Sequence, residues 1–229
     1  MRGIFLKYMR TKQILIFLLF VNFLGCGQPA QQNSSSSSKS SQVENISPLP
    51  ADNGSAKFQP FYIYLDKGNK ANHYIPSGFM PNGQCLKLDE KWIEDCQSGE
   101  TCIRVVYDIE CSNRDQRWAG IFWLNPANNW GRQKGGFNLT GAQKLTFWAR
   151  GENGGERIEE FKVGGISGDY PDTDMAVIGP VILTKEWRQY TVDLRGKDLA
   201  YISGGFAWAA NVDANPQSCT FYLDEIKYE

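Results

Sequence analysis

The chain has 229 residues, of which 24 are lysine or arginine and 25 are aspartate or glutamate, and its formal net charge is −1 at pH 7. Four of the basic residues and none of the acidic ones lie in the first 25 positions, so residues 26–229 carry 20 basic and 25 acidic side chains and a net charge of −5. An acidic chain without a basic cluster argues against nucleic acid and against anionic membrane surfaces as partners.

The first 25 residues have the three parts of a secretory signal. A basic start is followed by an unbroken apolar run over residues 14–21, and the segment ends at Gly25. Counted from residue 14 to residue 25, the apolar segment has twelve residues. A helix needs roughly 20 residues to cross a bilayer, so the segment is predicted to be cleaved rather than to span the membrane.

Cys26 follows directly after Leu24 and Gly25. This arrangement resembles the bacterial lipobox, in which the cysteine is diacylated and becomes the first residue of the mature chain, although Phe23 stands where a leucine is more common. The resemblance implies a lipoprotein that is anchored through acyl chains at Cys26, outside the cytoplasm, in the cell envelope and on the outer membrane. The alternative is an ordinary signal peptide whose cysteine is incidental.

Residues 26–57 predict a lipidated, disordered linker. Residues 27–56 include five consecutive serines and almost no large apolar residue before Phe58. A segment that buries so little apolar surface does not offset its ordering entropy, and 30 flexible residues extend over about 30 Å. The folded domain is therefore expected over residues 58–229, a length that suits one domain with a sizeable core.

Five cysteines follow Cys26, and in an exported protein they are read as disulfide partners. The chain has one histidine and no Cys-x-x-Cys pair, which argues against a zinc site. Because five is odd, one thiol stays free, and two bridges among five cysteines leave fifteen arrangements open. We expect at least one bridge within residues 85–111, where four of the five lie, and Cys219 as the free thiol.

Short runs rich in aromatic and β-branched residues recur between glycines, asparagines and prolines, and no segment has a sustained 3.6-residue apolar period. This pattern predicts an all-β sandwich with little helix. The expected strands are residues 61–65, 102–109, 118–124, 144–150, 158–163, 176–183, 188–194, 205–210 and 219–226.

Alternation within three of these strands assigns their tryptophans to faces. In residues 144–150, Leu145, Phe147 and Ala149 share one face, so Trp148 and Arg150 fall on the face that meets solvent or ligand. In the strand 118–124, the two tryptophans at its ends lie on opposite faces, and only one of them is expected to face a ligand. In the strand 205–210, the tryptophan belongs to a core-like set.

The order of these elements resembles a known group of domains. The supporting segments are WAGIFWLNPANNWG, KLTFWAR, EWRQYTVDL and the closing CTFYLDEIKYE. They are similar to the jelly-roll domains of galactose-binding-like topology that serve as carbohydrate-binding modules on bacterial extracellular proteins, and the resemblance covers residues 58–229. It implies a β-jelly-roll and a non-catalytic carbohydrate-binding function.

In that family a calcium ion often joins the first strand to the last. The matching positions are Asp66 and Asp224, and the resemblance therefore implies a structural calcium site at these two carboxylates. The alternative is that Asp224 only accepts backbone hydrogen bonds at a strand bulge.

The candidate ligand-binding residues are Trp148 and Arg150 on the polar strand face, Trp130 in an asparagine-rich loop, and Tyr170 and Asp172 in the loop 168–174. Aromatic faces pack on the C–H faces of sugar rings, while polar neighbours hydrogen-bond the hydroxyls.

No catalytic residues are expected. Glu159 and Glu160 are adjacent in a predicted strand, so their side chains should face opposite sides and should not flank one glycosidic bond.

Three functions remain open: a glycan-binding lipoprotein, which is favoured, a protein-binding surface lipoprotein such as an adhesin or assembly factor, and a glycan hydrolase or lyase. Exposed aromatics over a groove would indicate the first, a flat apolar patch the second, and carboxylates clustered in a cleft the third.

Overall fold

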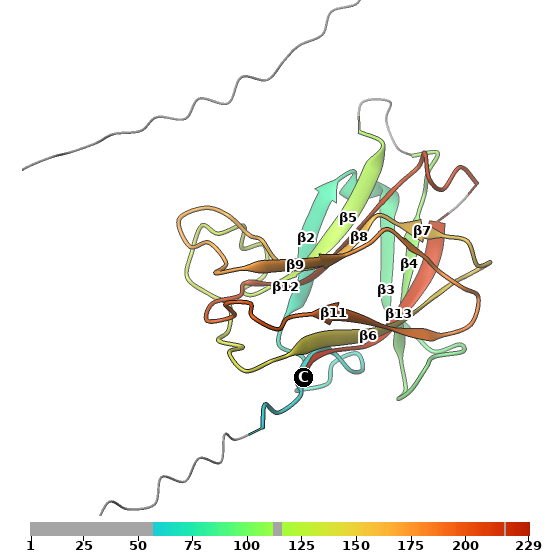
Figure 1. Ribbon diagram of the computed structural model, residues 1–229. Coiled ribbons are helices and arrows are strands. Elements are labelled where there is room, and N and C mark those ends of the chain that lie inside the picture. Colours follow the sequence, from blue (N-terminus) through green and yellow to red (C-terminus); the bar gives the residue numbers. More distant parts are fainter. Residues whose placement is uncertain (1–56, 112–115, 218) are drawn as a thin grey trace, which may run out of the picture. The chain divides into compact units, whose positions relative to one another are not determined.

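Two antiparallel sheets face each other in this protein and form a β-jelly-roll sandwich (Figure 1). The computed structural model describes residues 57–111, 116–217 and 219–229. The predicted signal, the anchor at Cys26 and nearly all of the linker lie outside these residues. In the part of the chain that is described, no helix is long and apolar enough to cross a membrane.

Strands make up almost all of the regular structure of the described residues. They are β1 (Phe61–Tyr64), β2 (Ile75–Pro81), β3 (Leu86–Trp92), β4 (Cys102–Tyr107), β5 (Trp118–Leu124), β6 (Lys144–Gly151), β7 (Arg157–Ile158), β8 (Glu160–Gly164), β9 (Met175–Ile178), β10 (Val181–Ile182), β11 (Arg188–Asp193), β12 (Gly204–Asn211) and β13 (Cys219–Tyr228), with one short 3-10 helix, η1 (Gly83–Cys85).

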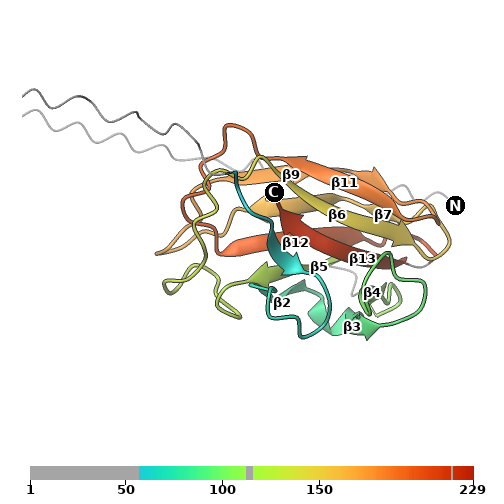
Figure 2. The ribbon, with the colours of Figure 1, turned by 90° about the horizontal axis from the view of Figure 1, so that it is seen from below.

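The six-stranded sheet has the order β11-β6-β13-β4-β3, with β1 paired to β13, and the five-stranded sheet has the order β2-β5-β12-β8-β9. Seen from below, β11, β6 and β13 lie side by side (Figure 2). The chain passes repeatedly from one sheet to the other, for example between β4 and β5, β5 and β6, β11 and β12, and β12 and β13. Such crossings between two sheets are typical of a jelly roll. A small third sheet pairs β7 with β10.

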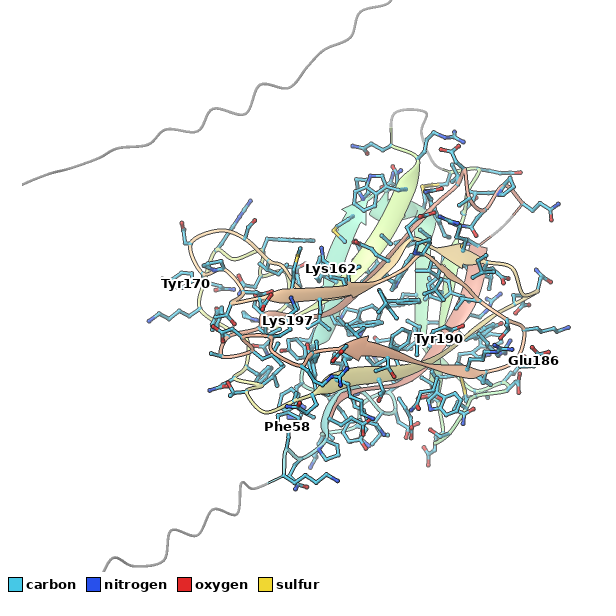
Figure 3. The ribbon with its side chains drawn as sticks, in the orientation of Figure 1. Phe58, Lys162, Tyr170, Glu186, Tyr190 and Lys197 are labelled. Carbon is cyan, nitrogen blue, oxygen red and sulfur yellow. A yellow bond between two sulfur atoms is a disulfide. The ribbon has the colours of Figure 1, made fainter. Side chains whose placement is uncertain are left out.

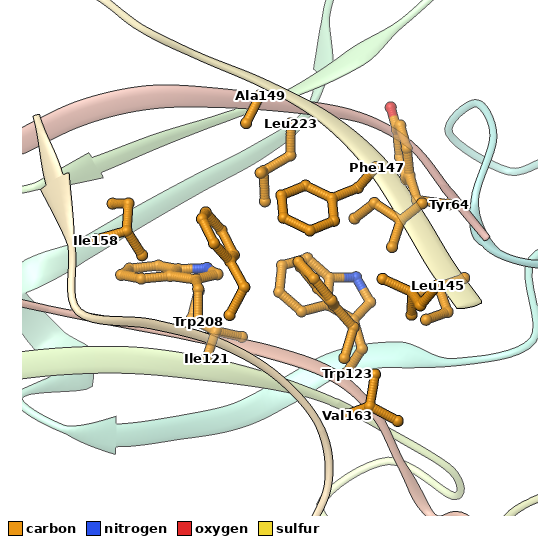
Figure 4. Packing of buried hydrophobic residues seen from close by; sticks show 14 of the residues in the cluster. Tyr64, Ile121, Trp123, Leu145, Phe147, Ala149, Ile158, Val163, Trp208 and Leu223 are labelled. Carbon is orange, nitrogen blue, oxygen red and sulfur yellow. The ribbon is translucent and has the colours of Figure 1, made fainter. Parts of the chain in front are cut away.

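The core lies between the two sheets, as the alternation of apolar residues predicts. Leu145, Phe147 and Ala149 of β6 are fully buried, and so are Trp123 of β5 and Trp208 of β12. Figure 4 shows the two indoles of the five-stranded sheet pointing toward Phe147. The core assignment of Trp208 is therefore confirmed, and Trp123 is the tryptophan of its strand that faces inward.

Two predicted strands are each divided in two. The expected strand 158–163 becomes β7 and β8, with a bend at Glu159. The expected strand 176–183 becomes β9 and β10, separated by Gly179 and Pro180. Proline has no N–H for the ladder, and Gly179 has φ 147°, so pairing stops there.

The two strands that the pattern does not predict, β2 and β3, lie at sheet edges. β2 contains Pro76, Gly78 and Pro81, and β3 alternates leucine with charged residues in the sequence LKLDEKW. Prolines and charges are typical of edge strands because they discourage pairing with another chain, and they remove the apolar signal by which strands are recognised.

Two disulfides fix the segment between β2 and β4. Cys85 bonds to Cys111 and Cys96 bonds to Cys102, so the expectation of a bridge within residues 85–111 is confirmed. Cys219 is free and buried, as predicted. Burial raises the pKa of the Cys219 thiol to about 12, which keeps it protonated and unreactive in the folded protein.

Candidate functional site

Small residues line the middle of the outward face of the five-stranded sheet. Ala209 of β12 pairs with Gly120 of β5 on one side and with Glu160 of β8 on the other. In the next row along the strands, Ala207 lies between Phe122 and Lys162. Phe206 and Trp208 of β12 point into the core, so the middle of the strand presents only the methyl groups of Ala207 and Ala209 outward, while β5 and β8 carry the longer side chains.

Trp118, the first residue of β5, stands at one end of this outward face. Its cross-strand partner is Asn211, and 41% of its surface is exposed. A pocket of about 420 Å³ opens beside it, lined by Arg117, Trp118, Glu159, Glu160, Ala209, Ala210, Asn211 and Asp213. This volume lies in the range of small-molecule sites, and the pocket combines one aromatic face with amide, carboxylate and guanidinium groups.

Two of the three carboxylates in the pocket are held by arginines. The Arg117 guanidinium donates to Asp213 at 2.7 Å and 2.9 Å, and it lowers the pKa of that carboxyl group. Arg157 and the Asn211 amide donate to Glu159 at 3.0 Å and 3.1 Å. Both carboxylates are therefore held in place by hydrogen bonds.

The positions of Glu159 and Glu160 correct a sequence-based expectation. Their side chains were expected on opposite faces of one strand, but both line the same pocket. The reason is the bend at Glu159 between β7 and β8: its N–H donates to the carbonyl of Ala209, and it does not continue the pleat of β8. The alternation rule holds only within a continuous strand.

Trp130, Tyr170 and Asp172 lie together at the opposite end of the same sheet face. The Trp130 indole packs edge-on against Phe122, with ring centroids 5.9 Å apart, and the N–H of Tyr170 donates to the carbonyl of Gly131. Figure 3 shows Tyr170 far out on its loop and Lys162 on β8. The structure thus brings these three predicted residues together at a distance from the pocket.

Asp172 holds its loop to the sheet. Its carboxylate accepts hydrogen bonds from the N–H of Ile166 at 3.0 Å, from the N–H and hydroxyl of Ser203, and from the N–H of Gly204. Four donors already occupy the two oxygens, so the carboxylate orders the chain around Trp130.

Trp148 and Arg150 lie on the outward face of the other sheet and do not join the other three predicted residues. Only 7% of Arg150 is exposed, because its guanidinium lies between the rings of Tyr222 and Trp187 and forms an ion pair with Asp95 at 3.2 Å. The loop held by Cys96–Cys102 covers this part of the face. The alternation within β6 is correct, but the loop shields the face that was expected to meet solvent or ligand.

The carboxylates of Asp66 and Asp224 both bind backbone amides of that same loop. Asp66 accepts from the N–H groups of Glu100 and Thr101 at 2.7 Å and 2.8 Å. Asp224, fully buried, accepts from Ser98 at 3.0 Å and from Glu225 at a strand bulge, and burial raises its pKa to about 6. Within the described residues no group of three or more histidines, cysteines or acidic residues is placed to hold a metal. These contacts correspond to the hydrogen-bonding alternative.

The calcium site at Asp66 and Asp224 stays a prediction, and it has a direct test. An ion that binds the folded state alone raises the free energy of unfolding by RT ln(1 + [L]/Kd), so the melting temperature should be higher in millimolar calcium than in EDTA. The Asp224→Asn variant, which lacks the carboxylate, should show no such difference. Equal melting temperatures of the parent protein in the two buffers would count against the site.

Sequence reasoning placed Trp118 on the face opposite to Trp123 but did not select it as a binding residue. The signal lies in the partner strand β12, where GGFAWAAN places Phe206 and Trp208 on one face and the small residues Ala207 and Ala209 on the other. The bulky face has to be the core, and the partner residues of the alanines on β5, Gly120 and Phe122, share their face with Trp118.

No family model matches the chain, and no curated protein matches it significantly. Among solved structures, a family 30 carbohydrate-binding module is similar to it at 14% sequence identity and a TM-score of 0.49, over 75% of this chain and 88% of the module. A family 11 carbohydrate-binding module of a cellulosomal cellulase of Clostridium thermocellum matches at 14% identity and a TM-score of 0.46, over 74% of this chain and 94% of the module. A family 29 carbohydrate-binding module matches at 10% identity and a TM-score of 0.43, over 75% of this chain and 91% of that one. These likenesses concern the fold alone.

Proposed function

We propose that the domain binds carbohydrate in the pocket beside Trp118 and catalyses no reaction on it. The observation that carries this proposal is the exposed Trp118 indole next to a pocket of about 420 Å³ whose other walls are polar. A sugar ring needs this combination, because its C–H face packs on an aromatic ring while its hydroxyls need donors and acceptors at the edge.

The surroundings of Trp118 favour a ligand over a purely structural role. The two other tryptophans of this sheet, Trp123 and Trp208, are fully buried and fill the core, whereas Trp118 lies outside it. Beside the indole, the small residues Gly120 and Ala209 leave space above the sheet. A flat sugar ring therefore has room to contact the Ala209 methyl group and the Trp118 indole together.

The carboxylates of the pocket support binding rather than hydrolysis. Glycoside hydrolysis requires two carboxyl groups, one of which donates a proton. Arg117 lowers the pKa of Asp213 and so weakens it as an acid, and the carboxylate of Glu159 is occupied by hydrogen bonds from Arg157 and Asn211. Glu160 is the one carboxylate of the pocket without an arginine partner among the described residues, and a single free carboxylate does not supply both roles.

The binding proposal predicts the behaviour of two tryptophan variants. Trp118→Ala should weaken glycan affinity by about tenfold or more, because a buried aromatic contact typically contributes more than about 1.4 kcal/mol. Its melting temperature should remain close to that of the parent protein, since the side chain lies outside the core. Trp148→Ala, on the other sheet, is the matched control and should retain the affinity.

The glycan for this comparison would come from a glycan array, and calorimetry would give the affinities. Equal affinity of Trp118→Ala and the parent protein would contradict the proposed site. Release of new reducing ends from a bound polysaccharide would contradict the absence of catalysis.

A protein-binding function is the second candidate, and a separate observation favours it. Met175 and Val177 of β9 expose 53% and 46% of their surfaces on the same outward face. Exposed apolar side chains at a sheet edge are common in protein interfaces. A pull-down that captures one partner, lost in Val177→Glu but kept in Trp118→Ala, would favour this function over glycan binding.

We propose further that the domain is lipid-anchored at Cys26 in the cell envelope. This proposal rests on the cysteine after Leu24 and Gly25 and on the serine-rich segment that follows. Cys26→Ser should move the protein from the membrane fraction to the soluble fraction and abolish labelling by a palmitate analogue. Continued labelling of Cys26→Ser would contradict the anchor.

A further inference from the structure

We infer that Glu160, which lines the pocket beside Trp118, and Lys162, in the next row of the sheet, together bind neighbouring hydroxyl groups of the glycan, and that this glycan is uncharged. The inference rests on the proposed carbohydrate-binding function and specifies the chemistry of its ligand. Both residues lie on the outward face of β8, two positions apart, in the rows of Ala209 and Ala207.

The positive and negative side chains around the pocket are equal in number. Each carboxylate of its lining has one cationic partner: Arg117 for Asp213, Arg157 for Glu159, and Lys162 for Glu160. Three cations therefore face three carboxylates, and the pocket carries no net charge that would attract an anionic or a cationic ligand.

The third pair differs from the other two because it is not closed by a hydrogen bond. The Arg117 and Arg157 pairs have N···O distances of 2.7 Å and 3.0 Å, whereas the Lys162 Nζ and the Glu160 Oε1 are 3.9 Å apart. A separation of 3.9 Å exceeds hydrogen-bonding distance. In the described part of the chain, neither the Lys162 ammonium nor the Glu160 carboxylate has a hydrogen-bonding partner.

The position of Phe122 explains why Lys162 and Glu160 do not form a hydrogen bond with each other. The Lys162 Nζ lies 5.0 Å from the centroid of the Phe122 ring, within the range of a cation–π contact, and the register of β5, β12 and β8 fixes both residues in one row. The ammonium group is thus held above the ring, and the side chain of Glu160 is 38% exposed toward the pocket.

An open donor–acceptor pair matches two neighbouring hydroxyl groups. Lysine offers three donors and the carboxylate offers acceptors only, so one sugar hydroxyl can accept from Nζ while the next donates to the carboxylate. Hydrogen bonds to charged groups are stronger than those between neutral groups. A charged sugar fits less well, because the attraction of one member of the pair is offset by the repulsion of the other, and the charged group still has to lose part of its hydration.

The test compares oligosaccharides with the same β-1,4 linkage but different charge: cellohexaose and mannohexaose as neutral probes, an oligoglucuronate as the anionic probe and a glucosamine hexamer as the cationic probe. Calorimetry with the full domain should show binding of a neutral probe whose Kd is nearly the same in low and high salt. The charged probes should bind about tenfold more weakly.

Glu160→Ala and Lys162→Met should each weaken binding of the neutral probe by about tenfold at an unchanged melting temperature. Glu186→Ala, which removes an exposed glutamate elsewhere, is the matched control and should bind like the parent protein.

Two results would overturn the inference while the proposed function stands. One is tighter, salt-dependent binding of a charged probe. The other is full affinity of the Glu160 and Lys162 variants for a neutral probe that Trp118→Ala no longer binds. If no oligosaccharide binds at all, the proposed function itself fails.

Discussion

Trp208→Ala should lower the free energy of unfolding by about 3–5 kcal/mol, the usual cost of removing a large aromatic residue from a core. Trp208 is fully buried on β12, and its indole meets Phe221 of the opposite sheet edge-on, with centroids 4.9 Å apart at 88°. The contact joins the two layers of the sandwich, so its loss leaves a cavity that neither sheet can close alone. Urea denaturation at a constant m value measures the difference.

Two further variants separate cavity formation from other effects. Among the described residues the Trp208 Nε1 has no hydrogen-bond partner. Trp208→Phe gives up volume but removes this unsatisfied donor, so its cost should be clearly smaller than that of the alanine variant. Trp118→Ala, on the outward face, should cost about 1 kcal/mol or less. A Trp208→Ala protein as stable as Trp118→Ala would contradict the assignment of the core.

Removal of the Cys85–Cys111 disulfide is the second change with a large expected effect. The bridge joins residues 26 apart, and the chain-entropy relation for a loop of this length gives about 3–4 kcal/mol. The loop closed by this bridge contains the edge strand β3 and Asp95, which pairs with Arg150. Loss of the cross-link should therefore weaken the contacts of both with the rest of the sheet. The double variant Cys85→Ser/Cys111→Ser should therefore unfold at markedly lower urea concentration.

The Cys96–Cys102 bridge provides the matched comparison. It joins residues only 6 apart, for which the same relation gives about 2.4 kcal/mol. Cys96→Ser/Cys102→Ser should thus be the less damaging of the two double variants. The opposite order would show that the short bridge acts through the contacts of Asp95 and Ser98 with the six-stranded sheet rather than through the length of its loop.

The fold could be predicted from the sequence wherever a strand buries one face. The alternation in residues 144–150 and 205–210 identifies the core, and the observed β6 and β12 carry it. The prediction missed β2 and β3, because edge strands carry prolines and charges in place of alternating apolar residues. It also joined β7 to β8, because a bend at one residue does not change the composition of a segment, and it joined β9 to β10 although Gly179 and Pro180 between them favour a break.

The candidate site was less accessible to prediction, since it depends on which segments meet. Period-two alternation correctly separates the two faces of β6, but it does not reveal that the loop around Asp95 covers Arg150. It likewise does not show that the bend at Glu159 directs the side chains of two neighbouring glutamates into one pocket. Trp118 could have been found from the alanines of β12, once the register between the two strands was considered.

The most direct test of carbohydrate binding at Trp118 is a two-dimensional NMR titration of the indole N–H signals with a neutral oligosaccharide, assigned by single tryptophan variants. We predict that the Trp118 signal shifts in proportion to occupancy, while those of Trp123, Trp208 and Trp148 stay in place. Shifts confined to Trp148, or no shift at saturating oligosaccharide, would contradict the account.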